Sequence, residues 1–137
     1  MKRMMVAVLV SGLWINLSEF LRNEYVLKDR WVDHYASMGM VFPSEPANGM
    51  VWMIWGFLFA GCIAAMRQRL AFGGTVFLAW VMGFVLMWLV VGNLGVLPVR
   101  VLSVAVPWSL IEVALAVLIT QRIMGGNIDN RTPRFIR

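Results

Sequence analysis

The chain has 137 residues, of which 61% are hydrophobic and 14% are charged, and its formal net charge is +5. An average soluble domain is about half apolar and about a quarter charged, and a soluble domain this short leaves much of its surface in water. The composition therefore argues against a soluble domain and predicts an all-α integral membrane protein. The basic residues fall mostly at the ends of apolar segments and form no stripe with interleaved aromatics, so we expect no nucleic-acid partner.

Four apolar stretches approach the roughly 20 residues that a helix needs to cross a bilayer core. We expect transmembrane helices at about residues 4–25, 49–66, 72–94 and 98–123, which form one domain over residues 1–124, and a short basic tail at 125–137. The first stretch runs on into polar residues without a small-residue cleavage motif, so it is interpreted as a helix and not as a signal peptide. Asn48 is expected to cap the second helix, Gly95 to end the third, and Pro98 to open the fourth.

The loop after the first helix has its own helical pattern over about residues 28–42. Its apolar side chains recur every three to four residues: Leu27, Trp31, Tyr35, Met38 and Phe42. His34 belongs to the opposite, polar face. This pattern predicts an amphipathic helix in the plane of the membrane interface. It is either an anchor or a lid over a cavity between the helix ends.

Lys and Arg residues are distributed unequally between the two sides that four crossings define. One side carries Lys2, Arg3, Arg67, Arg69, Arg122, Arg131, Arg134 and Arg137. The other side carries Arg22, Lys28, Arg30 and Arg100. The positive-inside rule then places both termini in the cytoplasm and the first loop outside. We expect a multi-pass protein of the cell membrane, in a bacterium the inner membrane.

Glu112 is the strongest candidate for a functional side chain, because it lies near the middle of the fourth helix. A charged residue at that depth costs roughly 2.5 kcal/mol or more unless other groups satisfy it. Trp108 and Ser109 share its face together with small residues, which predicts that this face packs inward. Pro107 removes one helical donor nearby and predicts a local kink. Glu112 is therefore expected to be neutral or paired with a cation.

Further polar and aromatic residues fall in the outer half of the membrane, at the level above Glu112. The predicted ligand- or proton-binding set is Glu112, Glu19, Asn16, Asn93, Trp52, Trp55, Trp108 and Ser109. Arg22 is expected to pair with Glu19 or Ser18 from the next turn. The alternative is structural, since polar groups in membrane helices often only bond neighbouring helices. Trp14, Trp80 and Trp88 lie deeper and are interpreted as packing residues.

The sequence offers little for several common chemistries. His34 is the only histidine and Cys62 the only cysteine, so the usual ligands of zinc or haem are missing and we expect no cofactor. The serines have no histidine at a depth from which it could activate them. A small-residue stripe in the second helix, Gly56, Ala60 and Ala64, serves either the internal bundle or a homodimer.

Three functions remain open. The first is a non-enzymatic protein that binds or transports a small apolar or cationic molecule through an outward-facing cavity, with Glu112 as counter-charge or proton site. The second is an accessory subunit of a larger membrane complex. The third is a lipid-modifying or isomerising enzyme that uses Glu19 and Glu112 as an acid–base pair. We expect the lipid bilayer as a partner, and a small-molecule or lipid ligand in the first case.

Overall fold

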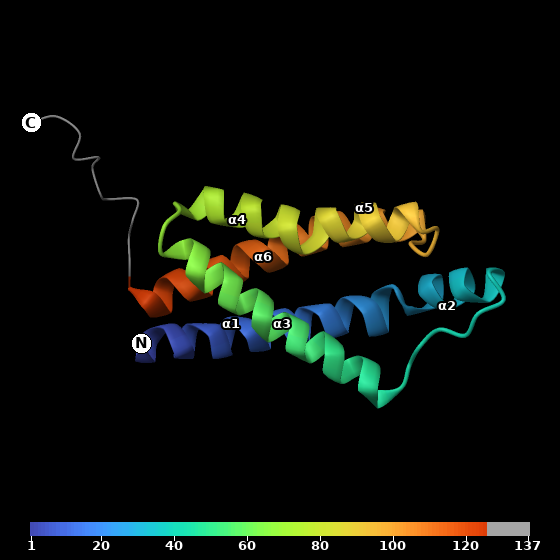
Figure 1. Ribbon diagram of the computed structural model, residues 1–137, viewed down its shortest axis with the longest axis horizontal. Helices are drawn as coiled ribbons and strands as arrows, with labels where there is room; N and C mark the ends of the chain where they lie inside the picture. Colours follow the sequence, from blue (N-terminus) through green and yellow to red (C-terminus); the bar gives the residue numbers. More distant parts are fainter. Residues whose placement is uncertain (126–137) are drawn as a thin grey trace, which may run out of the picture.

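The computed structural model describes residues 1–125, and all regular structure in this range is helical (Figure 1). Four helical segments are long and apolar enough to cross a membrane: Lys2–Val26, Pro46–Arg67, Phe72–Asn93 and Val99–Met124. These segments confirm the four predicted spans. The basic tail lies outside the described residues, apart from Gly125.

The described residues form six α-helices, two π-helical segments and one 3₁₀ turn. The α-helices are α1 (Lys2–Phe20), α2 (Lys28–Ser37), α3 (Pro46–Arg67), α4 (Phe72–Trp80), α5 (Leu86–Asn93) and α6 (Leu102–Met124). A π-helical segment, Leu21–Val26, extends α1, and a second, Val81–Val85, joins α4 to α5. A 3₁₀ turn, Val99–Val101, leads into α6.

The α1 helix packs mainly against α3 and α6. Two glycines allow the close approach of α1 and α3. A Cβ on Gly12 would lie 2.4 Å from the Phe57 ring, and a Cβ on Gly56 would lie 2.5 Å from the Asn16 side-chain nitrogen. Ala60 and Ala64 are fully buried on the same face of α3 as Gly56, so the small-residue stripe serves the internal bundle.

One apolar core fills the centre of the bundle, with fully buried Ile15, Ile63, Phe84 and Val117 among its members. Large apolar side chains also cover the outside. Leu13, Leu58 and Phe77, for example, are 62%, 66% and 66% exposed. An apolar exterior around an apolar core is the pattern that lipid favours and water disfavours.

Two predicted boundaries are wrong. The helix of the first loop ends at Ser37 and does not reach residue 42, because Gly39 adopts a left-handed conformation (φ 72°) and the Met40 amide turns back to the Tyr35 carbonyl. The α3 helix begins at Pro46, with Glu45 and not Asn48 in the N-cap position. Proline is well suited to the first helical position, since its missing amide hydrogen has no acceptor there.

The long helices run up and down, so that the polypeptide reverses direction at each connection. Figure 1 places the N-terminus, the α3–α4 turn and the end of α6 at one end of the bundle. At the other end lie α2 and the connection between α5 and α6, which turns at Gly95 (φ 73°) as expected. The α2 helix extends beyond the ends of α5 and α6.

Candidate functional site

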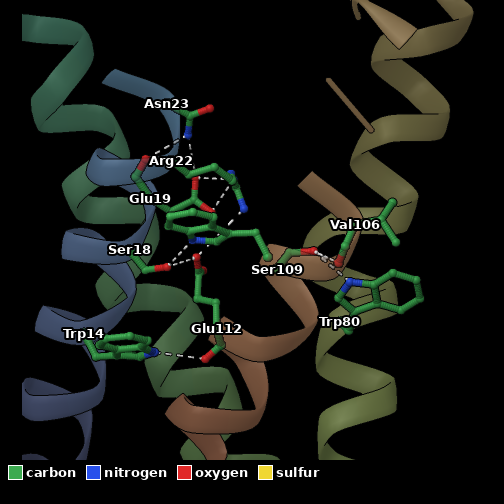
Figure 2. A network of polar contacts seen from close by, with 10 residues as sticks. Trp14, Ser18, Glu19, Arg22, Asn23, Trp80, Val106, Ser109 and Glu112 are labelled. Carbon is green, nitrogen blue, oxygen red and sulfur yellow. Dashed lines mark hydrogen bonds and ion pairs between the residues drawn. The ribbon is translucent and has the colours of Figure 1, made fainter. Parts of the chain in front are cut away.

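A buried network of polar side chains joins α1 to α6 in the half of the bundle nearer α2 (Figure 2). Its four central members are Ser18, Glu19, Arg22 and Glu112, which are 3%, 7%, 4% and 1% exposed. Three of them lie within two neighbouring turns near the end of the first span, and the α1–α6 contact brings the fourth beside them. Polar groups at this degree of burial are costly unless they bond one another.

Glu112 is held by donors from α1. The Ser18 hydroxyl donates to Glu112 Oε2 at 2.6 Å, and the Trp108 indole donates in turn to the Ser18 hydroxyl oxygen at 2.9 Å. The Trp14 indole donates to the Glu112 main-chain carbonyl at 3.0 Å (Figure 2). These bonds fix the Glu112 side chain at the α1–α6 interface.

Arg22 connects the two carboxyl groups. Its Nη2 donates to both oxygens of Glu19, at 2.5 and 2.6 Å, and its Nη1 lies 3.9 Å from Glu112 Oε2. Asn23 donates a further bond of 3.0 Å to Glu19 Oε2. The expected pairing of Arg22 with Glu19 is confirmed. Arg22 belongs to the buried network and not to the outer loop in which the sequence analysis counted it.

Both π-helical segments contribute to this site. The first contains Arg22, and the second contains Phe84, whose ring centroid lies 5.4 Å from the Arg22 guanidinium carbon. A π-helical turn shifts the direction of the side chains that follow it, and such turns are frequent at functional sites. The aromatic face stabilises the buried cation by a cation–π contact.

The network contains more negative than positive groups. One guanidinium group, that of Arg22, forms ion pairs with the two carboxyl groups of Glu19 and Glu112. Glu19 receives three bonds to its carboxyl oxygens, whereas Glu112 Oε1 is buried and accepts no hydrogen bond from the described residues. Glu112 is thus left with one free acceptor, and the cluster needs one more positive charge or proton to become neutral.

A groove of about 500 Å³ lies between α1 and α6, and Glu112 belongs to its lining. Its lining consists of Trp14, Ser18, Leu21, Ser103, Val104, Pro107, Trp108, Ile111 and Glu112. The polar side chains come from Ser18, Ser103 and Glu112, and the walls are otherwise apolar. Ile111 is 62% exposed on the outer surface of the spans, so the groove opens sideways, toward the lipid.

The structure brings together only part of the predicted site. Glu112 and Trp108 line the groove, and Glu19 is linked to them through Arg22. Ser109 lies on another side of α6, where it accepts a bond of 2.9 Å from the Trp80 indole.

The remaining predicted residues lie away from the groove. Asn16 faces α3 and donates to the main chain of Gly12 and Met53. Trp55 stacks on Phe59 within the aromatic core.

The last two residues of the predicted site are exposed. Trp52 is 48% exposed at the outside of α3, and Asn93 is exposed at the end of α5. The outer-half residues therefore do not line a single cavity.

Sequence reasoning did not include Trp14, Ser18 and Arg22 in the site. Their spacing of four residues places them on one face of a helix, but the spacing alone does not show that this face packs against α6. The three deep tryptophans, Trp14, Trp80 and Trp88, pack against the core as expected, and Trp14 and Trp80 also use their indole nitrogens as hydrogen-bond donors.

Within residues 1–125 no three acidic, histidine or cysteine side chains are close enough together to hold a metal ion. No protein-family model matches the sequence, and neither the curated proteins nor the solved structures include a significant match.

Proposed function

We propose that this protein binds a small amphiphilic molecule with an apolar body and a cationic, hydrogen-bond-donating group. The molecule enters the α1–α6 groove from the lipid, and its polar group donates to Glu112 Oε1. Two observations carry the proposal: Glu112 Oε1 is buried and accepts no hydrogen bond from the described residues, and Glu112 belongs to the lining of an apolar groove of about 500 Å³. Small-molecule sites have volumes of about 300–1,000 Å³ and combine apolar walls with few polar groups.

The chemistry of the lining supports a cation. An ionised Glu112 would be neutralised only in part by Arg22, since Arg22 bonds Glu19 at short range and lies 3.9 Å from Glu112 Oε2. Trp14 of α1 and Trp108 of α6 belong to the lining, and indole faces attract cations by about 2 kcal/mol in a desolvated site. An ammonium group would supply both the missing charge and the missing hydrogen bond.

Binding is favoured over transport by the packing below the site. Further along α6, Ala116 and Val117 are fully buried, as are Ile63 and Ala64 of α3 opposite them. Close-packed side chains leave no room for a ligand to pass. We therefore propose a binding protein and do not assign a translocation path to a single copy of the chain.

For its cellular setting we propose a bacterial inner membrane with both termini in the cytoplasm. The described ends of the spans support this orientation. The end of the bundle with the N-terminus carries Lys2, Arg3, Arg67, Arg69 and Arg122, and the opposite end carries Lys28, Arg30 and Arg100. The positive-inside rule favours the first group in the cytoplasm, and the binding groove then lies in the outer half of the membrane.

The enzyme alternative has less support from the geometry. An acid–base pair needs both groups at the substrate, but the groove is lined by Glu112 and not by Glu19, which is occupied by Arg22 and Asn23. The accessory-subunit alternative predicts instead that Glu112 is only a structural residue. The affinity of Glu112→Gln for a cationic amphiphile distinguishes this alternative from ligand binding.

Three probes that share a dodecyl chain test the proposal on the purified protein in lipid nanodiscs, with intrinsic tryptophan fluorescence as the readout. Dodecylammonium has charge and donors, dodecyltrimethylammonium has charge without donors, and dodecanol has a donor without charge. We expect dodecylammonium to bind most tightly. Glu112→Gln should weaken its binding about tenfold or more, because a hydrogen bond to a charged group contributes about 1.5–3 kcal/mol.

Glu45→Gln is the matched control, because Glu45 is an exposed carboxyl at the start of α3. It corrects for the general attraction of cations to exposed carboxylates and should leave the affinity unchanged. Equal affinities of the wild type and Glu112→Gln for dodecylammonium, with both proteins equally stable, would refute ligand binding at Glu112 and favour the accessory subunit.

A further inference from the structure

A second cavity, of about 860 Å³, lies at the end of the bundle that carries α2. It is formed where α2 packs against the connection between α5 and α6. The lining residues are Arg30, Asp33, His34, Leu97, Pro98, Val99, Arg100 and Ser103. We call it the arginine pocket, because two guanidinium groups belong to it.

Hydrogen bonds to the main chain fix the α2 side of this pocket. Arg30 Nη1 donates to the Arg100 carbonyl at 3.0 Å, and His34 Nε2 lies 3.1 Å from the Gly95 carbonyl oxygen. Since a carbonyl oxygen only accepts, Nε2 carries the proton in this contact. The polar face of α2 is thereby held against the α5–α6 connection, and Arg30 is positioned beside Arg100.

The two arginines have no ion-pair partner among residues 1–125. The salt bridges in this range join Arg22 to Glu19 and Glu112, and Lys28 to Glu24. One carboxylate, that of Asp33, also lines the pocket but lies outside ion-pairing distance of both guanidinium groups. The pocket therefore carries a net positive charge and, at the same time, one acceptor for a hydroxyl group.

The position of the pocket points to a lipid and not to a soluble anion. Its wall includes Leu97, Pro98 and Val99, and Val99 is 73% exposed at the beginning of the fourth span. Ser103 lines both this pocket and the α1–α6 groove, so the pocket adjoins a surface that faces the acyl chains. A phosphate bound here would have apolar surface directly beneath it.

We propose that the arginine pocket binds the headgroup of an anionic phospholipid that carries hydroxyl groups, such as phosphatidylglycerol. The guanidinium groups of Arg30 and Arg100 bind the phosphate oxygens, a geometry to which arginine is well matched. Asp33 accepts from a headgroup hydroxyl, and the acyl chains lie along the apolar outer surface near Val99. This site is distinct from the acceptor at Glu112 and does not depend on what binds there.

The test uses native mass spectrometry of the full-length protein, released from nanodiscs that contain phosphatidylglycerol and phosphatidylcholine in equal amounts. We expect phosphatidylglycerol to be retained preferentially. Arg100→Gln should reduce its retention about tenfold, the change expected when one charge-assisted contact is lost. Arg100→Lys should restore part of it, because the charge returns without the planar fork. Arg30→Gln should act in the same direction.

Arg69→Gln is the matched control, since Arg69 is an exposed arginine at the opposite end of the bundle. Equal loss with Arg69→Gln would show diffuse charge attraction and overturn the pocket, as would equal retention of the two lipids by the wild type. A separate titration with inorganic phosphate tests the free anion. Saturable phosphate binding that Arg100→Gln abolishes, without any preference among lipids, would overturn the assignment to a lipid.

Discussion

Ser18 is central to the polar network, because its single hydroxyl group forms hydrogen bonds with both Glu112 and Trp108. Replacing it with alanine removes one hydrogen bond that it donates and one that it accepts, of 2.6 and 2.9 Å. Side-chain hydrogen bonds between membrane helices contribute on average about 0.6 kcal/mol and at most about 1.7 kcal/mol each. Ser18→Ala should therefore lower the free energy of unfolding by about 1–3 kcal/mol.

Ser11 provides a control in the same helix. It is fully buried, but its hydroxyl donates only to the Ala7 carbonyl, one turn earlier. Such a bond within one helix adds little stability, so Ser11→Ala should change the free energy of unfolding by less than about 0.5 kcal/mol. Unfolding of both variants is measured by steric trapping in bicelles. Equal costs for the two substitutions would refute the network between α1 and α6.

Two further predictions concern the fold. Gly12→Ala should destabilise the protein by about 1–3 kcal/mol, the usual cost of overpacking, because its Cβ would lie 2.4 Å from the Phe57 ring. Unfolding in bicelles measures the change in stability. An unchanged stability would contradict the close approach of α1 and α3. Cysteines placed at Ser44 and Gln68 should react with an impermeant maleimide from opposite sides of the membrane, and labelling of both from one side would contradict the arrangement of the spans.

The spans were predictable because apolar length alone distinguishes a membrane-crossing helix. The depth of Glu112 was predictable for the same reason. The face of α1 that packs against α6 was not predictable, since apolar residues surround this helix and no polar stripe distinguishes one side. Asn16 and Glu19 share a face by spacing, yet Asn16 bonds α3 whereas Glu19 joins the network with Glu112.

Local backbone geometry accounts for the other differences between the predicted and the observed structure. The π-helical turn at Leu21–Val26 includes Arg22 and changes the residue register there, and no sequence pattern signals such a turn. The helix of the first loop, α2, ends early because Gly39 adopts a positive φ, whereas the periodicity of its apolar residues continues to Phe42. That periodicity reflects real contacts, since the Phe42 ring packs against Trp31 and Tyr35 after the helix has ended.

We propose Glu112 Oε1 as the acceptor for a ligand in the α1–α6 groove. Infrared difference spectroscopy tests it most directly, with dodecylammonium added to the protein in lipid and the carboxyl bands recorded before and after. We predict a change in these bands that disappears in Glu112→Gln and remains in Glu45→Gln. A difference spectrum that is the same in the wild type and in Glu112→Gln would contradict the account.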